Sequence, residues 1–437
     1  MNEIQNGHAS REGWRHASLG KLLPIKYGKS LPAQLRDPDG THPVYGSSGM
    51  VGTHSAALTT GPTLIVGRKG NVGAVHYSSV PCWPIDTAYF VETPSGHNLL
   101  YYKYLLESLN LVKLDRSTAI PGLSRDDYNA VEVSIAPPAK QDEIVAELEK
   151  QISRLDEAVA NLQRVKANLK RYKASVLKDA VEGRLVPTEA ELARREGRSF
   201  ETGEQLLLRI LEARRGTWKG KCDSPTPPLR PEDVAIPKGW AWITVSQAMR
   251  ERIVNGLSIK ESPIPTEVKA LRLSAMSDQG LDFDDFRCLP IDPTKVEDIA
   301  IRESDFFVSR GNGTLELVGR GSPAQKPKQT IIFPDTMMRI RFTEAANVGP
   351  WFHALWSTRL VRRQIEKRVK TTAGIYKMAQ PELASITIPL PPLFEQLRIV
   401  TEVDRRLSIV RGVEAEVDAN LKRAQALRQA TLVKSFS

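Results

Sequence analysis

The chain contains two copies of one pattern, and this repeat constrains its fold more than any other feature. Each copy opens on Gly-Trp, at 13–14 and 239–240, and runs to a double proline followed by a long amphipathic segment. The two segments begin Gln-Asp-Glu-Ile-Val at Gln141 and Gln-Leu-Arg-Ile-Val at Gln396, an offset of 396 − 141 = 255 that also pairs Leu177 with Leu432. The repeat predicts two large modules in tandem, each a globular part followed by a helix.

Length and composition agree with two folded modules. At 437 residues the chain is too long for one ordinary core, and 41% hydrophobic residues are enough for two. No apolar run approaches the length of a membrane span, and residues 1–15 lack the apolar centre of a signal peptide. Cys82, Cys222 and Cys288 are far apart, as expected of reduced thiols. We therefore expect a cytoplasmic protein with no membrane contact.

The charge balance favours a polyanionic partner without requiring one. Lys and Arg number 61 against 51 Asp and Glu, which gives a net charge of +10 and a pI near 9.4. This is compatible with binding of DNA or RNA. Basic charge that serves only solubility explains the same numbers.

Each globular part is predicted to be a mixed α+β module. In the first, short β-rich runs at 63–66, 74–77, 86–91 and 131–135 surround a segment with helical spacing at 99–114. The second repeats this plan, with 306–309 and 335–340 matching two of the strands. Tyr101-Tyr102 and Trp351-Phe352 are interpreted as core aromatics.

A heptad seam follows each double proline. A helix from Gln141 to Glu182 is about 60 Å long at 1.5 Å per residue, too long to remain unpaired. We predict that it packs against its counterpart after Pro392 as an antiparallel intramolecular coiled coil, with the globular units at opposite ends. A homodimeric coiled coil is the alternative. The seam, also a candidate docking surface for partners, comprises Leu148, Ile152, Leu155, Val159, Leu162, Val403, Leu407, Val410, Val417 and Leu421.

The stretch between the repeats predicts a helical connector and then an extended linker. Thr188-x-x-Glu191 and Thr202-x-x-Gln205 are capping-box patterns. Residues 219–237 contain five prolines outside any periodicity. The resulting boundaries are 1–137 for the first globular domain, 138–186 for the first long helix, 187–236 for the connector and linker, 237–392 for the second globular domain, and 393–437 for the second long helix.

Motifs that carry catalysis or bind metal are missing from the sequence. Neither double proline has the polar residue and the aromatic of an adenine-methyltransferase loop, and Gly28-Lys29-Ser30 lacks the first glycine of a P-loop because position 23 is Leu. The seven histidines show no metal-ligand spacing. We expect no catalytic residue, no metal site and no cofactor in this chain.

Basic, glycine-rich turns at matching places in both modules are the candidate DNA-binding elements. Glycine lets a backbone approach phosphate closely, Arg can bind guanine through two hydrogen bonds, and Asn can bind adenine in the same way. A tight turn with solvated charges is the alternative reading. The candidates in these turns are Arg68, Lys69, Asn71, Arg310 and Asn312. Basic residues of other loops are further candidates: Arg116, Arg125, Arg320, Lys326, Lys328, Lys370 and Lys377.

Taken together, these features resemble the specificity (S) subunit of Type I restriction-modification systems, the HsdS family. The resemblance covers nearly the whole chain. It rests on the Gly-Trp openings, the basic glycine turns, Pro-Pro followed by Gln-x-x-Ile-Val in both halves, and the run Leu169–Val186, which looks like the conserved helix end of that family.

The resemblance implies a non-catalytic subunit with two target recognition domains, each reading one half of a split, asymmetric sequence in double-stranded DNA. The paired helices would set the gap and dock two adenine-methyltransferase (M) subunits, which supply S-adenosylmethionine. Motor-nuclease (R) subunits using ATP and Mg would then join. A subunit of a fused methyltransferase-nuclease system and a coiled-coil scaffold that binds proteins are the alternatives.

Overall fold

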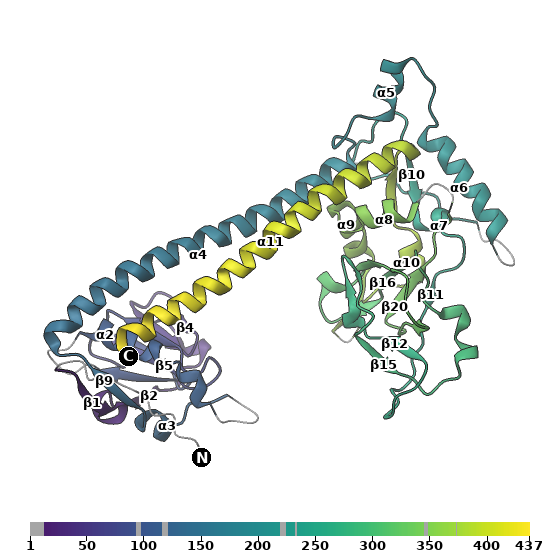
Figure 1. Ribbon diagram of the computed structural model, residues 1–437. Coiled ribbons are helices and arrows are strands. Elements are labelled where there is room, and N and C mark those ends of the chain that lie inside the picture. Colours follow the sequence, from purple (N-terminus) through teal and green to yellow (C-terminus); the bar gives the residue numbers. More distant parts are fainter. Residues whose placement is uncertain are drawn as a thin grey trace. The chain divides into compact units, whose positions relative to one another are not determined.

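The structure is a computed structural model that describes residues 13–92, 98–115, 121–218, 224–231, 234–344, 348–372 and 374–437. The chain divides into two compact units, of which the first is assembled from two separate stretches of sequence and the second from one (Figure 1). The first unit is Met1–Val165 with Ala415–Ser437, and the second is Lys166–Glu414.

The described residues of the first unit form three small sheets. A four-stranded sheet has the order β2-β8-β5-β6, a three-stranded sheet the order β4-β3-β7, and β1 pairs with β9. The strands are β1 Arg15–Ser18, β2 Lys26–Tyr27, β3 His42–Gly46, β4 Gly49–His54, β5 Thr63–Gly67, β6 Val75–Ser78, β7 Trp83–Pro84, β8 Ala88–Glu92 and β9 Glu132–Ile135, with helices α1 Leu19–Leu22, α2 Leu99–Ser108 and α3 Arg125–Asn129.

The second unit repeats this strand plan. Its sheets have the orders β11-β20-β16-β18 and β15-β12-β19, and β10 pairs with β23. These strands are β10 Ala241–Thr244, β11 Val254–Asn255, β12 Lys269–Leu271, β15 Phe286–Cys288, β16 Phe306–Ser309, β18 Gly321–Pro323, β19 Ile331–Ile332, β20 Met337–Ile340 and β23 Thr387–Leu390.

The pairing directions match as well as the orders. In each three-stranded sheet the central strand, β3 or β12, is antiparallel to one neighbour and parallel to the other. The repeat in the sequence is therefore a repeat in the fold, and the predicted α+β class with two modules is confirmed. The second unit adds a two-stranded pair, β13 Met276–Ser277 with β14 Gly280–Leu281, and a sheet of β17 Gly311–Asn312, β22 Ile375–Lys377 and β21 Lys370–Thr372.

The helix predicted over 99–114 is shorter than expected, and this prediction was wrong in its extent. α2 ends at Ser108, and a short 3-10 helix occupies Leu111–Leu114. Asn110 lies between them with φ of 49°, in the left-handed region that ends helices. Tyr101 and Tyr102 of α2 are buried, as are Trp351 and Phe352 of the second unit, so the prediction of core aromatics is confirmed.

The double-proline motif has the same geometry in both repeats. The side-chain Nε2 of Gln141 donates to the carbonyl of Ala136 at 3.0 Å, and that of Gln396 donates to the carbonyl of Pro391 at 2.8 Å. Both glutamines are buried. The repeated glutamine therefore binds the chain just before each long helix begins.

The two long helices are α4, Pro138–Val181, and α11, Leu393–Phe436. Each contributes one part to each unit, and in both units the two parts run antiparallel (Figure 1). The predicted intramolecular pairing of these helices is confirmed. Among the seam residues Leu148, Ile152, Val403, Val410 and Val417 are buried, and Leu155, Val159, Leu162, Leu407 and Leu421 are half-buried.

The ends of the two long helices are exchanged between the repeats. Leu177, at the end of α4, packs in the core of the second unit with Ile399 and Val403. Leu432, the residue that matches it in the repeat, packs in the core of the first unit with Leu148 and Ile152. Each core is therefore completed by the helix end of the other repeat.

The connector helices begin as the sequence predicts. Thr188 and Thr202 accept from the backbone N–H three residues on, and the side chains of Glu191 and Gln205 accept in return. These capping boxes start α5 Glu189–Glu196 and α6 Gly203–Thr217. The remaining helices of the second unit are α7 Val245–Ala248, α8 Val348–Trp356, α9 Arg359–Arg368 and α10 Gln380–Ala384.

In the part of the chain that the structure describes, no helix has the length and apolarity needed to cross a membrane. Cys82 and Cys288 are free thiols, and burial raises the pKa of Cys82. Cys222 lies outside the described residues.

Candidate nucleic-acid interface

The basic turn of the first unit is shaped by glycine. A Cβ on Gly67, the last residue of β5, would lie 2.0 Å from the carbonyl oxygen of Asn71, so only glycine allows the chain to close there. Gly70 and Gly73 have φ of 82° and 73°. Val72 is buried and fixes the turn, while the Lys69 and Asn71 side chains face solvent.

Two predicted arginines lie beside one exposed aromatic ring. Tyr27, on β2, is 50% exposed. The guanidinium carbon of Arg68 lies 5.0 Å from its ring centroid and that of Arg125 lies 6.0 Å away. Arg125 is the first residue of α3, which is capped by Ser124. An exposed ring flanked by two arginines offers both stacking and phosphate or guanine contacts.

Backbone contacts hold this cluster in place. The Arg68 side chain donates from Nη1 to the carbonyl of Asp86 at 3.0 Å, and its own carbonyl accepts from Leu123 N–H at 2.9 Å. Tyr89, packed edge-on against Tyr27 at 5.0 Å, donates its hydroxyl to the Leu123 carbonyl at 3.0 Å. Burial raises the pKa of Tyr89 to about 12, so this hydroxyl stays a donor at physiological pH.

The second unit makes the same connections with different side chains. Arg310 N–H donates to Thr336 at 2.7 Å, as Arg68 N–H donates to Thr87 at 2.9 Å. The Arg310 carbonyl accepts from Met378 N–H at 2.9 Å, as Arg68 does from Leu123. Arg68 and Arg310 are therefore equivalent positions in the two folds.

The segment after Arg310 is not the free loop that the sequence predicts, and this expectation was wrong. Gly311 and Asn312 form β17, which pairs with β22 at Lys377 and Tyr376. In the first unit the matching contact is a single bridge between Lys69 and Gly122. The paired residues are more than 60 positions apart, so no local sequence pattern predicts this pairing.

Two predicted lysines meet in this sheet. Lys370 of β21 and Lys377 of β22 are directly opposite each other. Nζ of Lys370 lies 3.5 Å from Oε1 of Glu382, but the Lys370 side chain is 82% exposed. Like charges placed opposite on a sheet repel. With Arg310 at the base of the same sheet, the cations form a surface that an anion would stabilise.

The positions that match Tyr27 and Arg125 carry amides in the second unit. Asn255 stands on β11 opposite Met338, as Tyr27 stands on β2 opposite Tyr89. Gln380 opens α10 two residues after Met378, as Arg125 opens α3 two residues after Leu123. Gln380 Nε2 donates to Asn255 Oδ1 at 3.1 Å. The same backbone arrangement, which we call the frame, thus presents an aromatic ring and two cations in the first unit. In the second unit it presents two amides and one cation.

Other predicted contacts lie elsewhere or are already engaged. The Arg320 guanidinium is 3.3 Å from the Asp278 carboxylate and donates to the Met276 carbonyl at 3.2 Å. Lys326 and Lys328 are exposed on the loop after β18, at the opposite end of β16 from Arg310. Arg116 lies outside the described residues. The structure does not bring Arg320, Lys326 or Lys328 into the cluster around Arg310.

Sequence reasoning missed Tyr27, Asn255 and Gln380. The signal for Tyr27 was present in Lys26-Tyr27-Gly28-Lys29, an aromatic between lysines beside a glycine. Asn255-Gly256 is the counterpart of Tyr27-Gly28. The Gly28 N–H donates to the carbonyl of Ala88, the first residue of β8, and the Gly256 N–H donates to the carbonyl of Met337, the first residue of β20. Nothing local marks Gln380. Among the described residues, no three His, Cys, Asp or Glu side chains come together as metal ligands.

Comparison with known proteins shows which proteins share this sequence pattern and fold. A family model described as the Type I restriction modification DNA specificity domain matches residues 11–170, which include Tyr27, Arg68 and Arg125. Residues 11–170 therefore belong to the family of Type I DNA specificity domains.

Two relatives show how far the likeness to other specificity subunits extends. The EcoKI specificity subunit of Escherichia coli K12 is 29% identical over 183 residues, which are 42% of this chain and 39% of that protein. The EcoDI specificity subunit of Escherichia coli is 22% identical, with 97% of this chain and 88% of that protein covered. The EcoKI match therefore spans about two fifths of its relative, while the EcoDI match spans most of both chains.

The fold of the chain also matches a solved structure. A chain from a structural study of complex assembly and conformational transition of the type I R-M system aligns over 98% of both chains with a TM-score of 0.58 and 15% identity. At this identity the likeness concerns the fold alone.

Proposed function

We propose that this specificity subunit binds double-stranded DNA through two modules that read different half-sites. The observation that carries the proposal is one frame with two sets of side chains: Tyr27, Arg68 and Arg125 in the first unit, Asn255, Arg310 and Gln380 in the second. Arg pairs with guanine and amides pair with adenine in the major groove. Two unlike readers imply a bipartite, asymmetric target.

The chain would act without catalytic residues of its own. Two adenine-methyltransferase subunits would dock on the long helices and bring S-adenosylmethionine, and motor-nuclease subunits would bring ATP and Mg. The DNA contacts would be the basic and amide side chains of the two modules (Arg68, Lys69, Asn71, Arg125, Arg310, Asn312, Lys370 and Lys377). Function in the bacterial cytoplasm fits this role.

The long helices would set the gap between half-sites. Each helix spans 44 residues, about 66 Å at 1.5 Å per residue. The seam residues Val410 and Val417 are buried along it. A paired, stiff connection would limit the separation at which both modules can bind one duplex.

A module exchange tests the proposal. The subunit is co-expressed with its methyltransferase partner, and methylated adenines are mapped before and after residues 13–137 are replaced by the matching module of another subunit. We expect one half of a bipartite motif to change while the other half stays. A change in both halves would contradict modular reading, and absence of methylation with salt-insensitive duplex binding would favour a protein-binding scaffold.

A further inference from the structure

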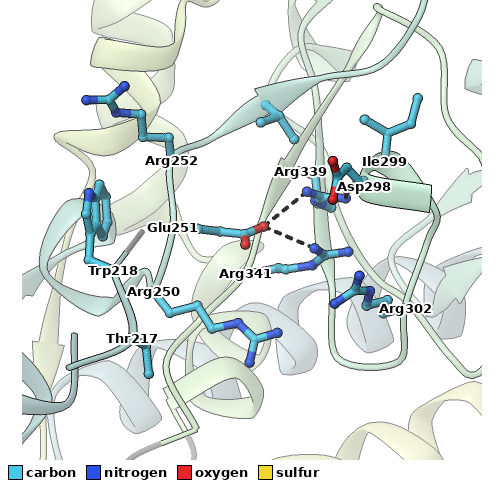
Figure 2. Close-up of a pocket in the computed structure, with 11 residues that line it drawn as sticks. Thr217, Trp218, Arg250, Glu251, Arg252, Asp298, Ile299, Arg302, Arg339 and Arg341 are labelled. Carbon is cyan, nitrogen blue, oxygen red and sulfur yellow. Dashed lines mark hydrogen bonds and ion pairs between the residues drawn. The ribbon is translucent and has the colours of Figure 1, made fainter. Parts of the chain in front are cut away.

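The second unit contains an open cavity of about 480 Å³ (Figure 2). It lies between the end of α6, the segment that leads into β11, and the end of β20. Small-molecule sites occupy about 300–1,000 Å³, but most are apolar. This one is lined by five arginines: Arg250, Arg252, Arg302, Arg339 and Arg341.

Two of these arginines are buried around one shared carboxylate. Arg339 and Arg341 are 3% and 5% exposed. Both donate to Oε1 of Glu251, at 3.0 and 3.2 Å, as the dashed lines of Figure 2 mark. Asp305 completes the set by accepting two bonds from Arg341, at 2.6 and 3.2 Å. Burial and the nearby Arg341 hold the pKa of the Arg339 guanidinium below its usual value.

Arginines outnumber carboxylates in the lining of the cavity. The cavity lining carries five arginines against two carboxylates, Glu251 and Asp298, which leaves 5 − 2 = +3. Including Asp305 reduces the excess to +2. Arg250 is also paired with Glu344 at 2.9 Å, but that carboxylate is 88% exposed and screened by water.

The fold does not require these arginines. Phe90 of the first unit occupies the position of Arg339 in the second. Phe90 lies two residues after the start of β8, and Arg339 lies two residues after the start of β20, the matching strand. Glu92 likewise occupies the position of Arg341. The same frame therefore forms with an apolar and an acidic residue at these places. Burial of two guanidinium groups is costly and is particular to the second module.

The cavity is separate from the candidate interface on the same unit. β20 begins at Met337, whose carbonyl accepts from Gly256 beside the Arg310 frame. Arg341 lies four residues further along the chain, about 13 Å away at 3.3 Å per residue. The two arginine-bearing surfaces therefore stand at opposite ends of one strand.

We infer that this cavity is an anion site that binds a phosphate group, supplied either by a free nucleotide or by a phosphate of the DNA backbone outside the half-sites. Guanidinium groups bind phosphate oxygens through paired hydrogen bonds. Arg252 and Arg302 stand at the exposed rim, and the buried Arg339 and Arg341 form the floor. The inference concerns a site that the proposed half-site reading does not use.

The test uses the full chain with deoxyadenosine monophosphate and inorganic phosphate as probes. Both are expected to raise the thermal unfolding temperature, while deoxyadenosine, which lacks the phosphate, does not. The double variant Arg252→Gln/Arg302→Gln is expected to weaken binding about tenfold or more. Asp298→Asn, which removes an exposed carboxylate from the lining, is expected to strengthen it severalfold. Arg359→Gln, an exposed arginine outside the cavity, is the matched control.

A second measurement distinguishes the two phosphate sources. If the DNA backbone supplies the phosphate, the double variant lowers the salt dependence of duplex binding by about one per lost contact, for any sequence. If a free nucleotide supplies it, duplex binding is unchanged and only the probe response is lost. The inference is overturned if neither probe binds and the salt dependence is unchanged, or if Arg359→Gln has the same effect as the double variant.

Discussion

The indole Nε1 of Trp240 donates a hydrogen bond of 3.0 Å to Oε1 of Glu395, in the first turn of α11. The other carboxylate oxygen accepts from the backbone N–H of Glu189, which opens α5, at 2.9 Å. Arg398 and Arg198 in turn pair with the Glu189 side chain at 2.7 and 2.6 Å. Glu395 is fully buried, and burial raises its pKa to about 7. One carboxyl group thus joins the module opening, the connector and the long helix of the second unit.

We expect stability to fall as the pH rises towards 7 and to level off above it. Because the folded-state pKa of Glu395 lies above the ordinary value of about 4.3, folding favours the protonated form. Its contribution is complete below about pH 4 and is lost between that pH and the folded-state pKa, with a limiting slope of about 1.4 kcal/mol per pH unit. Urea unfolding between about pH 4.5 and about pH 7.5 measures this slope.

The variant Glu395→Gln should flatten that dependence, because the amide does not titrate. Glu402→Gln is the control, since hydrogen bonds from Arg405 and Arg406 lower the pKa of Glu402 to about 2 and place its titration in acid. An equal slope in wild type and Glu395→Gln would mean that another group titrates.

Two glycine substitutions should have opposite effects on stability. A Cβ on Gly256 would lie 1.9 Å from the Phe333 carbonyl oxygen, so Gly256→Ala forces backbone apart and should cost more than about 3 kcal/mol. Gly412 lies in α11 with nothing within 4 Å of an added Cβ, so Gly412→Ala should stabilise by about 0.5–1 kcal/mol. Thermal unfolding of both variants checks the pair, and a loss of stability in Gly412→Ala would show a contact at that face.

The helix seam can be tested with two neighbouring residues. Val410 is 3% exposed and Ile409 is 57% exposed on the same helix. Val410→Asn buries an amide without a partner and should cost about 2–4 kcal/mol, whereas Ile409→Asn should stay within about 0.5 kcal/mol. Urea unfolding of the full chain measures both. Similar losses would contradict a seam that runs through Val410.

The two candidate readers should fail separately. Arg68→Gln is expected to cost about 1–3 kcal/mol of DNA affinity and to relax one half-site, and Arg310→Gln should do the same for the other half. Arg320→Gln should have a smaller effect, because that guanidinium is already paired with Asp278. Affinity for duplexes altered in one half at a time provides the measurement. The proposal fails if Arg68→Gln relaxes both halves.

A change of helix length tests the spacing role. One heptad inserted in both long helices, after Val165 and after Glu414 where the chain divides into its units, lengthens each by about 10 Å. We expect the gap in the mapped methylation motif to grow by about three base pairs at 3.4 Å each. The same heptad in α4 alone should break the seam register and reduce stability. An unchanged gap in the double insertion would remove the long helices from that role.

Features written in local spacing were predictable from the sequence. The two capping boxes, the heptad seams and the matching strands each depend on residues a few positions apart, and all are present in the fold. The repeat itself predicted that both modules share one plan. The buried tyrosines and tryptophan followed from their helical spacing.

Features that depend on distant partners were not predictable in the same way. Asn110 ends α2 in a conformation that glycine usually adopts, without a glycine in the sequence to mark it. The engagement of Arg320 with Asp278, and the pairing of β17 with β22, join residues that only the fold brings together. The candidate site was therefore predicted in its turns but not in its neighbours, of which Tyr27 is the clearest.

The exchange of helix ends has a consequence for synthesis on the ribosome. Leu432 and Phe436 complete the core beneath α2, and Phe436 meets the Tyr101 ring edge-on at 5.2 Å. At about 5–20 residues per second, these side chains emerge tens of seconds after the rest of that core has been made. The nascent N-terminal module therefore exposes an apolar patch until translation ends. We expect this module to need chaperones more than the second one does, and to be the one left incomplete when translation stops early.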